Sequence, residues 1–232
     1  GNGDRANTPV GKDPRVREAI ELAIDRNIIN QVVFAGEFTP GNQPVAPSNP
    51  FYAKTVPVPA RNVEKAKALL KEAGQTNLTF EMQVPTETQI TQVSQVIQAQ
   101  LAEAGITLKL ISIEFATALQ NQTKGTYTAS LIGWSGRPDP DGNIYAFVRS
   151  KASQNEAGYS NAAVDEALDG ARLTYDTAKR QALYTKAAEQ YLKDRPIIYL
   201  YHQKWLFAHS TKLAGFKPYP DAMIRLEGVK LQ

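Results

Sequence analysis

Residues 78–113, LTFEMQVPTETQITQVSQVIQAQLAEAGITLKLISI, contain the pattern that decides the fold. Apolar residues alternate with polar ones in 78–84 and again in 106–113, which is the period of a β-strand. Between these two runs, apolar residues of 87–104 recur at helical spacing, and Gly105 closes the helix. A strand, helix and strand joined by a crossover of this length normally form a parallel βαβ unit. The sequence therefore predicts an α/β protein.

The flanking sequence adds helices and short strands to this unit. Asp13 and Pro14 predict a helix start, because an aspartate N-cap and a proline in the first turn are typical there. We expect that first helix to cover residues 14–34, with further helices at 63–73, 115–124, 162–172 and 178–193. Further strands are expected at 127–134, 197–201 and 205–208. The predicted fold class is α/β, with a mixed sheet flanked by helices.

Composition excludes several classes of function. The 26 basic and 23 acidic residues are interspersed, so no basic face for nucleic acid is predicted. No apolar run approaches the roughly 20 residues of a membrane span, so the chain is not expected to be membrane-embedded. Cysteine is absent, and His202 and His209 lack a catalytic motif, so we expect no enzyme and no cofactor. Asp139 and Asp141 partly match a calcium loop, but Pro140 favours an Asx-type turn, and no metal site is predicted.

A series of motifs resembles the peptide and nickel family of bacterial solute-binding proteins, extracellular solute-binding protein family 5. The motifs occur in the family's order at 13–26, 64–74, 105–106, 133–140, 158–161 and 180–196. The resemblance implies the second lobe of a type II, two-lobed clamshell with a periplasmic-binding-protein-like fold. On this interpretation, residues 1–12 are a tag or cut end and 13–212 form the carboxy-terminal ligand-binding lobe. Residues 213–232 then return toward an amino-terminal lobe that this chain lacks.

The resemblance also implies a function. The chain is expected to belong to the substrate-binding component of an ABC importer, which captures a peptide or peptide-like solute and delivers it to permease subunits. Its expected location is periplasmic, or extracytoplasmic on a lipid-anchored protein. The alternative is a ligand-sensing lobe that docks to a chemoreceptor or membrane sensor.

The loop after the predicted strand 127–134 carries the main candidate ligand residues. Open α/β sheets bind ligands at this end of a strand, and the resemblance implies that Trp134 walls the pocket; the alternative is a core or interlobe tryptophan. Arg137 lies where peptide binders of the family usually carry an aspartate, which suggests a solute with an anionic group. Alternatively, Arg137 is solvated or paired with Asp139 or Asp141. Asp139 is itself a candidate ligand residue.

Three more candidates lie elsewhere in the sequence. Thr86 and Thr88 belong to the loop 85–89 between a strand's end and a helix's start, where backbone N–H groups and hydroxyls face one rim. Alternatively, both threonines cap the helix. Tyr159 either walls the cleft or packs in the core. We predict that Trp134, Arg137 and the loop 85–89 share one exposed surface.

Overall fold

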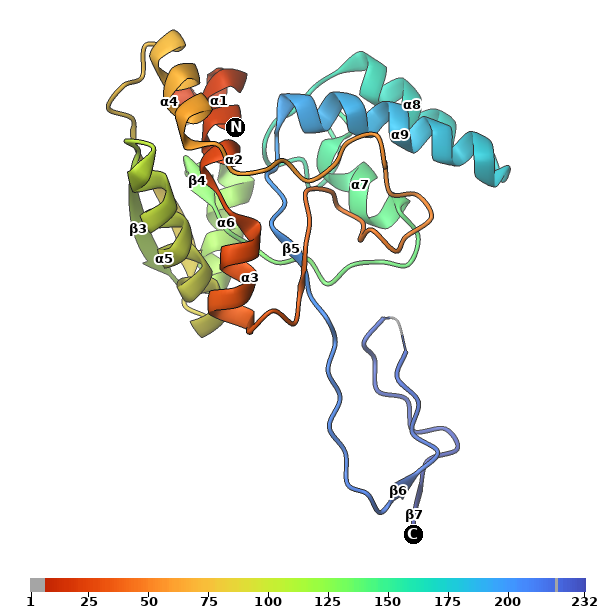
Figure 1. The fold of residues 1–232 in the computed structure, drawn as a ribbon. Coiled ribbons are helices and arrows are strands. Elements are labelled where there is room, and N and C mark those ends of the chain that lie inside the picture. Colours follow the sequence, from red (N-terminus) through yellow and green to blue (C-terminus); the bar gives the residue numbers. More distant parts are fainter. Residues whose placement is uncertain (1–6, 220) are drawn as a thin grey trace.

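The computed structural model describes residues 7–219 and 221–232 as two packed bodies and an arm (Figure 1). The first body contains α1 (Pro9–Lys12), α2 (Pro14–Ala23), α3 (Arg26–Phe34), α4 (Val63–Glu72), α5 (Thr88–Glu103) and α6 (Phe115–Lys124) around a small sheet. The second body contains α7 (Asp141–Val148), α8 (Ala162–Arg172) and α9 (Thr177–Asp194). The two-residue strands β1 (Thr39–Pro40) and β5 (Tyr201–His202) pair between the bodies, and β6 (Leu213–Ala214) pairs with β7 (Lys230–Leu231) in the arm.

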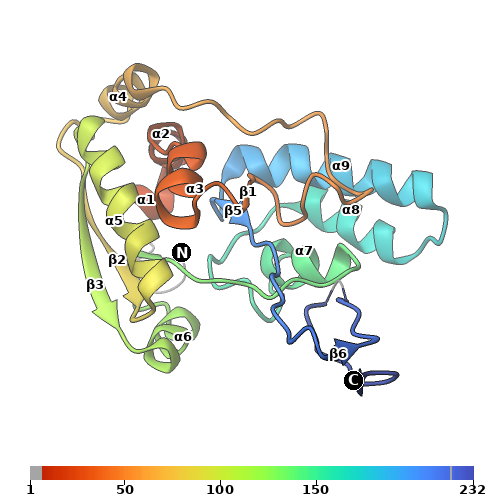
Figure 2. The ribbon, with the colours of Figure 1, turned by 60° about the horizontal axis from the view of Figure 1, so that its bottom comes forward.

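The sheet of the first body confirms the predicted βαβ unit. Strand β2 (Thr79–Pro85) pairs in parallel with β3 (Thr107–Ile113) along its whole length. On its other side β2 pairs in parallel with β4 (Ala129–Ser130), which gives the order β3-β2-β4. Figure 2 shows the crossover helix α5 lying against this sheet. The structure contains both parallel and antiparallel strand pairs. The parallel pairs form the sheet β3-β2-β4, and the antiparallel pairs β1-β5 and β6-β7 lie outside it.

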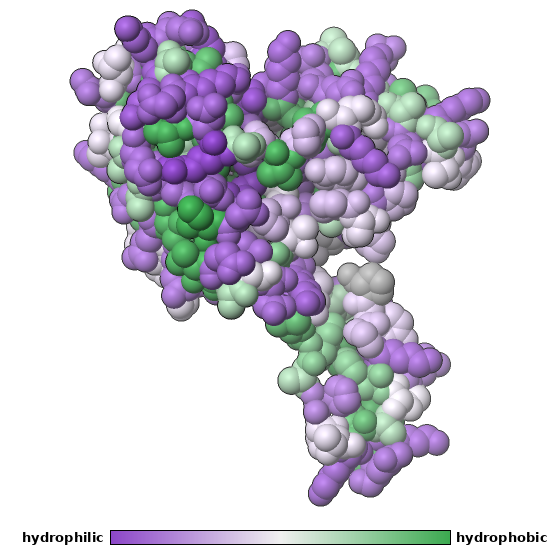
Figure 3. All heavy atoms as spheres, viewed as in Figure 1, coloured by the Kyte–Doolittle hydropathy of each residue, from purple (hydrophilic) through white to green (hydrophobic). Residues whose placement is uncertain are grey.

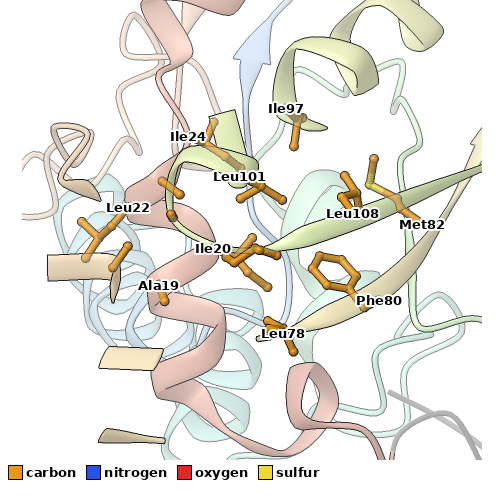
Figure 4. Close-up of a cluster of buried hydrophobic side chains, with 14 of the residues drawn as sticks. Ala19, Ile20, Leu22, Ile24, Leu78, Phe80, Met82, Ile97, Leu101 and Leu108 are labelled. Carbon is orange, nitrogen blue, oxygen red and sulfur yellow. The ribbon is translucent and has the colours of Figure 1, made fainter. Parts of the chain in front are cut away.

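Each body has its own hydrophobic core. In the first, Ile20 of α2 and Leu101 of α5 pack over Leu108 and Phe80 of the sheet (Figure 4). In the second, the facing sides of α8 and α9 bury their apolar residues with Ile144 of α7. In both bodies, the helix faces that pack against the core consist of apolar residues at helical spacing, as the sequence indicates.

The predicted single helix over 14–34 is wrong, because the structure divides it into α2 and α3. Ile24 is extended, and the Asp25 carboxylate accepts hydrogen bonds from the backbone N–H groups of Asn27 and Ile28. The buried side chain of Gln100 also satisfies Asp25, accepting from its N–H at 2.9 Å and donating to its carbonyl at 3.2 Å. Both helices bury residues in the same core, so the apolar spacing continues across the break.

The predicted strands over 127–134 and 197–201 are longer than those found, and the predicted strand over 205–208 is wrong. Of these residues, only 129–130 and 201 lie in strands, within the described part of the chain. The apolar run 197–201 has another cause: Ile198 and Leu200 pack against the first core, and Ile197 and Tyr199 pack against the second. An extended segment between two cores is therefore apolar on both sides without belonging to a full ladder.

After β5 the chain leaves both bodies and forms the arm of residues 203–232 (Figure 1). Large apolar side chains of the arm are exposed: Trp205, Leu206, Met223, Ile224, Leu226 and Leu231. Figure 3 shows apolar and polar residues interspersed over the arm's surface. The arm therefore contributes little to either core.

We predict that Leu101→Ala lowers the free energy of unfolding by about 2–5 kcal/mol, because it leaves a cavity between α5 and the sheet. Leu101 is 1% exposed. The control is Val32→Ala on α3, where the side chain is 67% exposed, and its expected change is below about 0.5 kcal/mol. Urea denaturation followed by circular dichroism measures both. Equal stability of the two variants would contradict this description of the core.

Candidate functional site

Two loops leave the same edge of the parallel sheet. Gln83 of β2 is opposite Ser130 of β4, and the Leu131 N–H donates to the Gln83 carbonyl at 3.1 Å. After β2 the chain enters the loop before α5, and after β4 it enters the loop of residues 131–140, here called the Trp134 loop. Because the strands are parallel and adjacent, both loops lie at their carboxyl ends, the usual ligand edge of open α/β sheets.

The buried side chain of Asn143 holds the Trp134 loop in place. Its Oδ1 accepts from the Trp134 indole Nε1 at 3.1 Å and from the Arg137 backbone N–H at 2.8 Å. Its Nδ2 donates to the carbonyls of Arg137 at 2.7 Å and Asp139 at 3.3 Å. Asn143 is 5% exposed and belongs to α7. Sequence analysis missed this residue, because a polar residue in the first turn of a short helix carries no signal of its own.

Trp134 has one packed edge and one accessible region. Its ring meets Phe147 of α7 in a T-shaped contact, with centroids 5.0 Å apart, yet the residue is 44% exposed. The Arg137 guanidinium carbon lies 4.7 Å from the indole centroid, within cation–π range. Trp134 and Arg137 are therefore brought together on an exposed surface, as predicted.

The two aspartates of this region are paired with arginines of the second body. Asp139 accepts two hydrogen bonds from Arg180 of α9, at 2.6 and 2.7 Å. Asp141 accepts two from Arg172 of α8, at 2.7 and 2.8 Å. The suggested pairing of Arg137 with either aspartate is therefore wrong, since these arginines hold both carboxylates. Asp139 Oδ1 also accepts from the Asp141 N–H at 2.9 Å, which confirms the Asx-type turn.

Thr86 and Thr88 are exposed at the same edge of the sheet. The Thr86 N–H donates to the carbonyl of Ile113, the last residue of β3, at 3.0 Å. The N-cap residue of α5 is Glu87, and this helix start has no side-chain cap hydrogen bond within the described chain. The alternative that both threonines cap the helix is therefore wrong.

Tyr159 lies in a different environment. It packs against the second core, and its hydroxyl donates to Asp194 Oδ2 at 2.6 Å. Burial and this hydrogen bond raise the pKa of the Tyr159 hydroxyl. The contacts of Tyr159 are those of the core alternative, and the structure does not join it to the Trp134 loop by a hydrogen bond or ring contact among the described residues.

Within residues 7–219 and 221–232, His, Asp and Glu side chains form no group of three that could hold a metal ion. None of the helices there combines the length and the apolar character needed to cross a membrane.

Similarity to known proteins shows the family of this chain. A model of the family described as bacterial extracellular solute-binding proteins, family 5 Middle, matches residues 4–155. The chain belongs to this family. Its match ends after α7, so it includes both loops of the sheet edge and excludes α8 and α9.

Relatives of known name and solved structures extend the match over nearly the whole chain. The glutathione-binding protein GsiB of Pectobacterium atrosepticum is 32% identical over 231 residues, 94% of this chain and 45% of that protein. DppA of Helicobacter pylori, solved with the peptide STSA, has 27% identity and a TM-score of 0.84 over 98% of this chain and 46% of its own. HbpA2 of Haemophilus parasuis has 26% identity and a TM-score of 0.82, with coverages of 98% and 46%. These matches confirm the periplasmic-binding-protein-like fold, and the chain spans about half the length of these family members.

We predict that Asn143→Ala moves the fluorescence emission of Trp134 to longer wavelength, because the indole loses its hydrogen bond and the Trp134 loop loosens. The variant is made in a Trp205→Phe background, which leaves Trp134 as the one tryptophan. Asn155→Ala is the matched control, since Asn155 is also buried and ties its own loop through Arg149 and Tyr159. Both variants should lose stability, but only Asn143→Ala should shift the emission of Trp134. A shift of the emission in Asn155→Ala and not in Asn143→Ala would contradict the role of Asn143.

A second prediction concerns Asp139 and pH. The hydrogen bonds from Arg180 hold the pKa of the Asp139 carboxyl below its ordinary value of 3.8. A carboxyl whose pKa is lower in the folded state stabilises that state at pH values above its ordinary pKa. This contribution is lost as the pH falls through the pKa of the folded state. Asp139→Asn should therefore lower the free energy of unfolding at pH 7 by up to about 1 kcal/mol, given the exposure of the pair. In urea titrations, the difference in the free energy of unfolding between the wild type and Asp139→Asn should narrow below pH 3.8. A difference that stays constant with pH would contradict the pairing of Asp139 with Arg180.

Proposed function

We propose that the protein carrying this chain is the substrate-binding component of an ABC importer and captures a peptide or peptide-like solute. The observation that carries the proposal is the family match together with the likeness to DppA, which was solved with a bound peptide. GsiB, named as a glutathione-binding protein, supports the same class of solute. The proposed role is capture and release, without chemical change of the solute.

The sheet edge offers groups that suit a peptide. The exposed region of Trp134 provides an apolar surface on which a side chain or a peptide plane can pack. At the same edge of the sheet, the start of α5 has no side-chain cap, so the first backbone N–H groups of this helix are available to carbonyl or carboxylate oxygens. The proposed contacts are Trp134, Arg137, Asp139, Thr86 and Thr88. Tyr159 packs against the second core instead.

We further propose that the solute binds between this lobe and a second one, and that closure of the lobes gives the form that the permease recognises. The exposed apolar residues of the arm support a contact of 213–232 with that second lobe. A single lobe provides part of the contacts, so this chain alone should bind solute weakly. This function places the protein outside the cytoplasmic membrane, in the periplasm or anchored to the cell surface.

Native mass spectrometry of the natural protein that contains this chain, purified without added solute, tests the proposal. The expected result is a bound species of peptide size that denaturation releases and that re-binds in calorimetry. The same solute should stimulate ATP hydrolysis by the cognate permease and ATPase subunits in liposomes. Binding without such stimulation would indicate a sensor instead of an importer. Turnover of ester, amide or phosphate substrates would contradict the proposal.

A further inference from the structure

Charge pairing around the Trp134 loop leaves one guanidinium without a carboxylate. Asp139 and Asp141 are each bound by two hydrogen bonds, to Arg180 and Arg172 respectively. Among the described residues, none of the ion pairs includes Arg137. The positive charge of Arg137 is therefore uncompensated at the carboxyl edge of the sheet.

The Arg137 guanidinium also retains unused donors in a suitable arrangement. Its Nη1 donates to Ser135 Oγ at 3.0 Å and to the Gly136 carbonyl at 2.6 Å. Nε and Nη2 have no hydrogen-bond partner in the described part of the chain. These two groups form one side of the guanidinium fork, which matches the two oxygens of a carboxylate.

Several contacts hold Arg137 in this position before any solute binds. Asn143 bonds both the N–H and the carbonyl of Arg137. A Cβ atom on Gly142 would lie 2.8 Å from Arg137 Cγ, so the side chain crosses this residue where it has no side chain. The guanidinium then lies over the Trp134 ring. A prearranged arginine loses less conformational entropy when it binds an anion.

We infer that Arg137, stacked on Trp134, selects solutes that carry a carboxylate at this edge of the sheet. The inference rests on the proposed capture of a peptide or peptide-like solute, and it names the chemical group that the site prefers. An exposed arginine contributes little in open water, but closure of a second lobe would remove water from the contact and strengthen it.

The test compares two pairs of probes on the natural protein that contains this chain. Each pair differs in carboxylates: glutathione against its diethyl ester, and the tetrapeptide Ser-Thr-Ser-Ala against its carboxy-terminal amide. Calorimetry measures their affinities for the wild type, Arg137→Gln, Arg137→Lys and Arg15→Gln. Arg15 is the control, because its guanidinium is also exposed but is paired with Asp13 at 2.7 Å, and it lies on α2 outside the proposed solute and lobe contacts.

For at least one pair, the wild type should bind the acid at least about 30-fold more tightly than the neutral probe. Arg137→Gln should abolish that preference by weakening the binding of the acid alone, Arg137→Lys should restore it in part, and Arg15→Gln should leave it unchanged. Equal affinity of the wild type and Arg137→Gln for the acids would overturn the inference and leave solute capture intact. Failure of the wild type to bind any of the four probes would overturn both. Matching urea midpoints show that each variant is folded.

Discussion

The parallel pairing of β2 with both β3 and β4 is the constraint on which the rest of the structure depends. Parallel strands cannot be joined by a tight hairpin, so the chain must cross the sheet each time, first through α5 and then through α6. Burial of α5 against the sheet fixes the first crossover. As a consequence, the loop before α5 and the Trp134 loop leave the sheet at the same edge.

The second body then determines the shape of that edge. Asn143 of α7 binds the backbone of the Trp134 loop, while arginines of α8 and α9 bind the two aspartates that follow Arg137. The extended segment 197–201 contributes side chains to both cores and so joins the two bodies. The candidate site is thus built from both: the sheet supplies the position, and the helices α7 to α9 supply the loop conformation and its charge pattern.

Local patterns in the sequence predicted the features that depend on local periodicity. The βαβ unit and the Asp13 helix cap are found as expected, since each depends on local spacing. The break at Asp25 was not predictable in this way, because Gln100, which satisfies it, lies 75 residues further along the chain.

The site shows the same division between local and distant information. An exposed loop carrying Trp134 and Arg137 followed from its position after a strand. The partners of Asp139 and Asp141 did not, because Arg180 and Arg172 are 41 and 31 residues away and reach the loop only after α8 and α9 have packed. The position of the candidate site therefore followed from local sequence, whereas its ion pairs depend on the packing of α8 and α9.

The most direct test of the account is a crystal structure of the natural protein with the solute that it retains on purification. The account predicts that the solute lies at the carboxyl ends of β2 and β4, in contact with Trp134 and with the loop before α5. A solute bound elsewhere, with Trp134 and Thr86 still exposed to solvent, would contradict it.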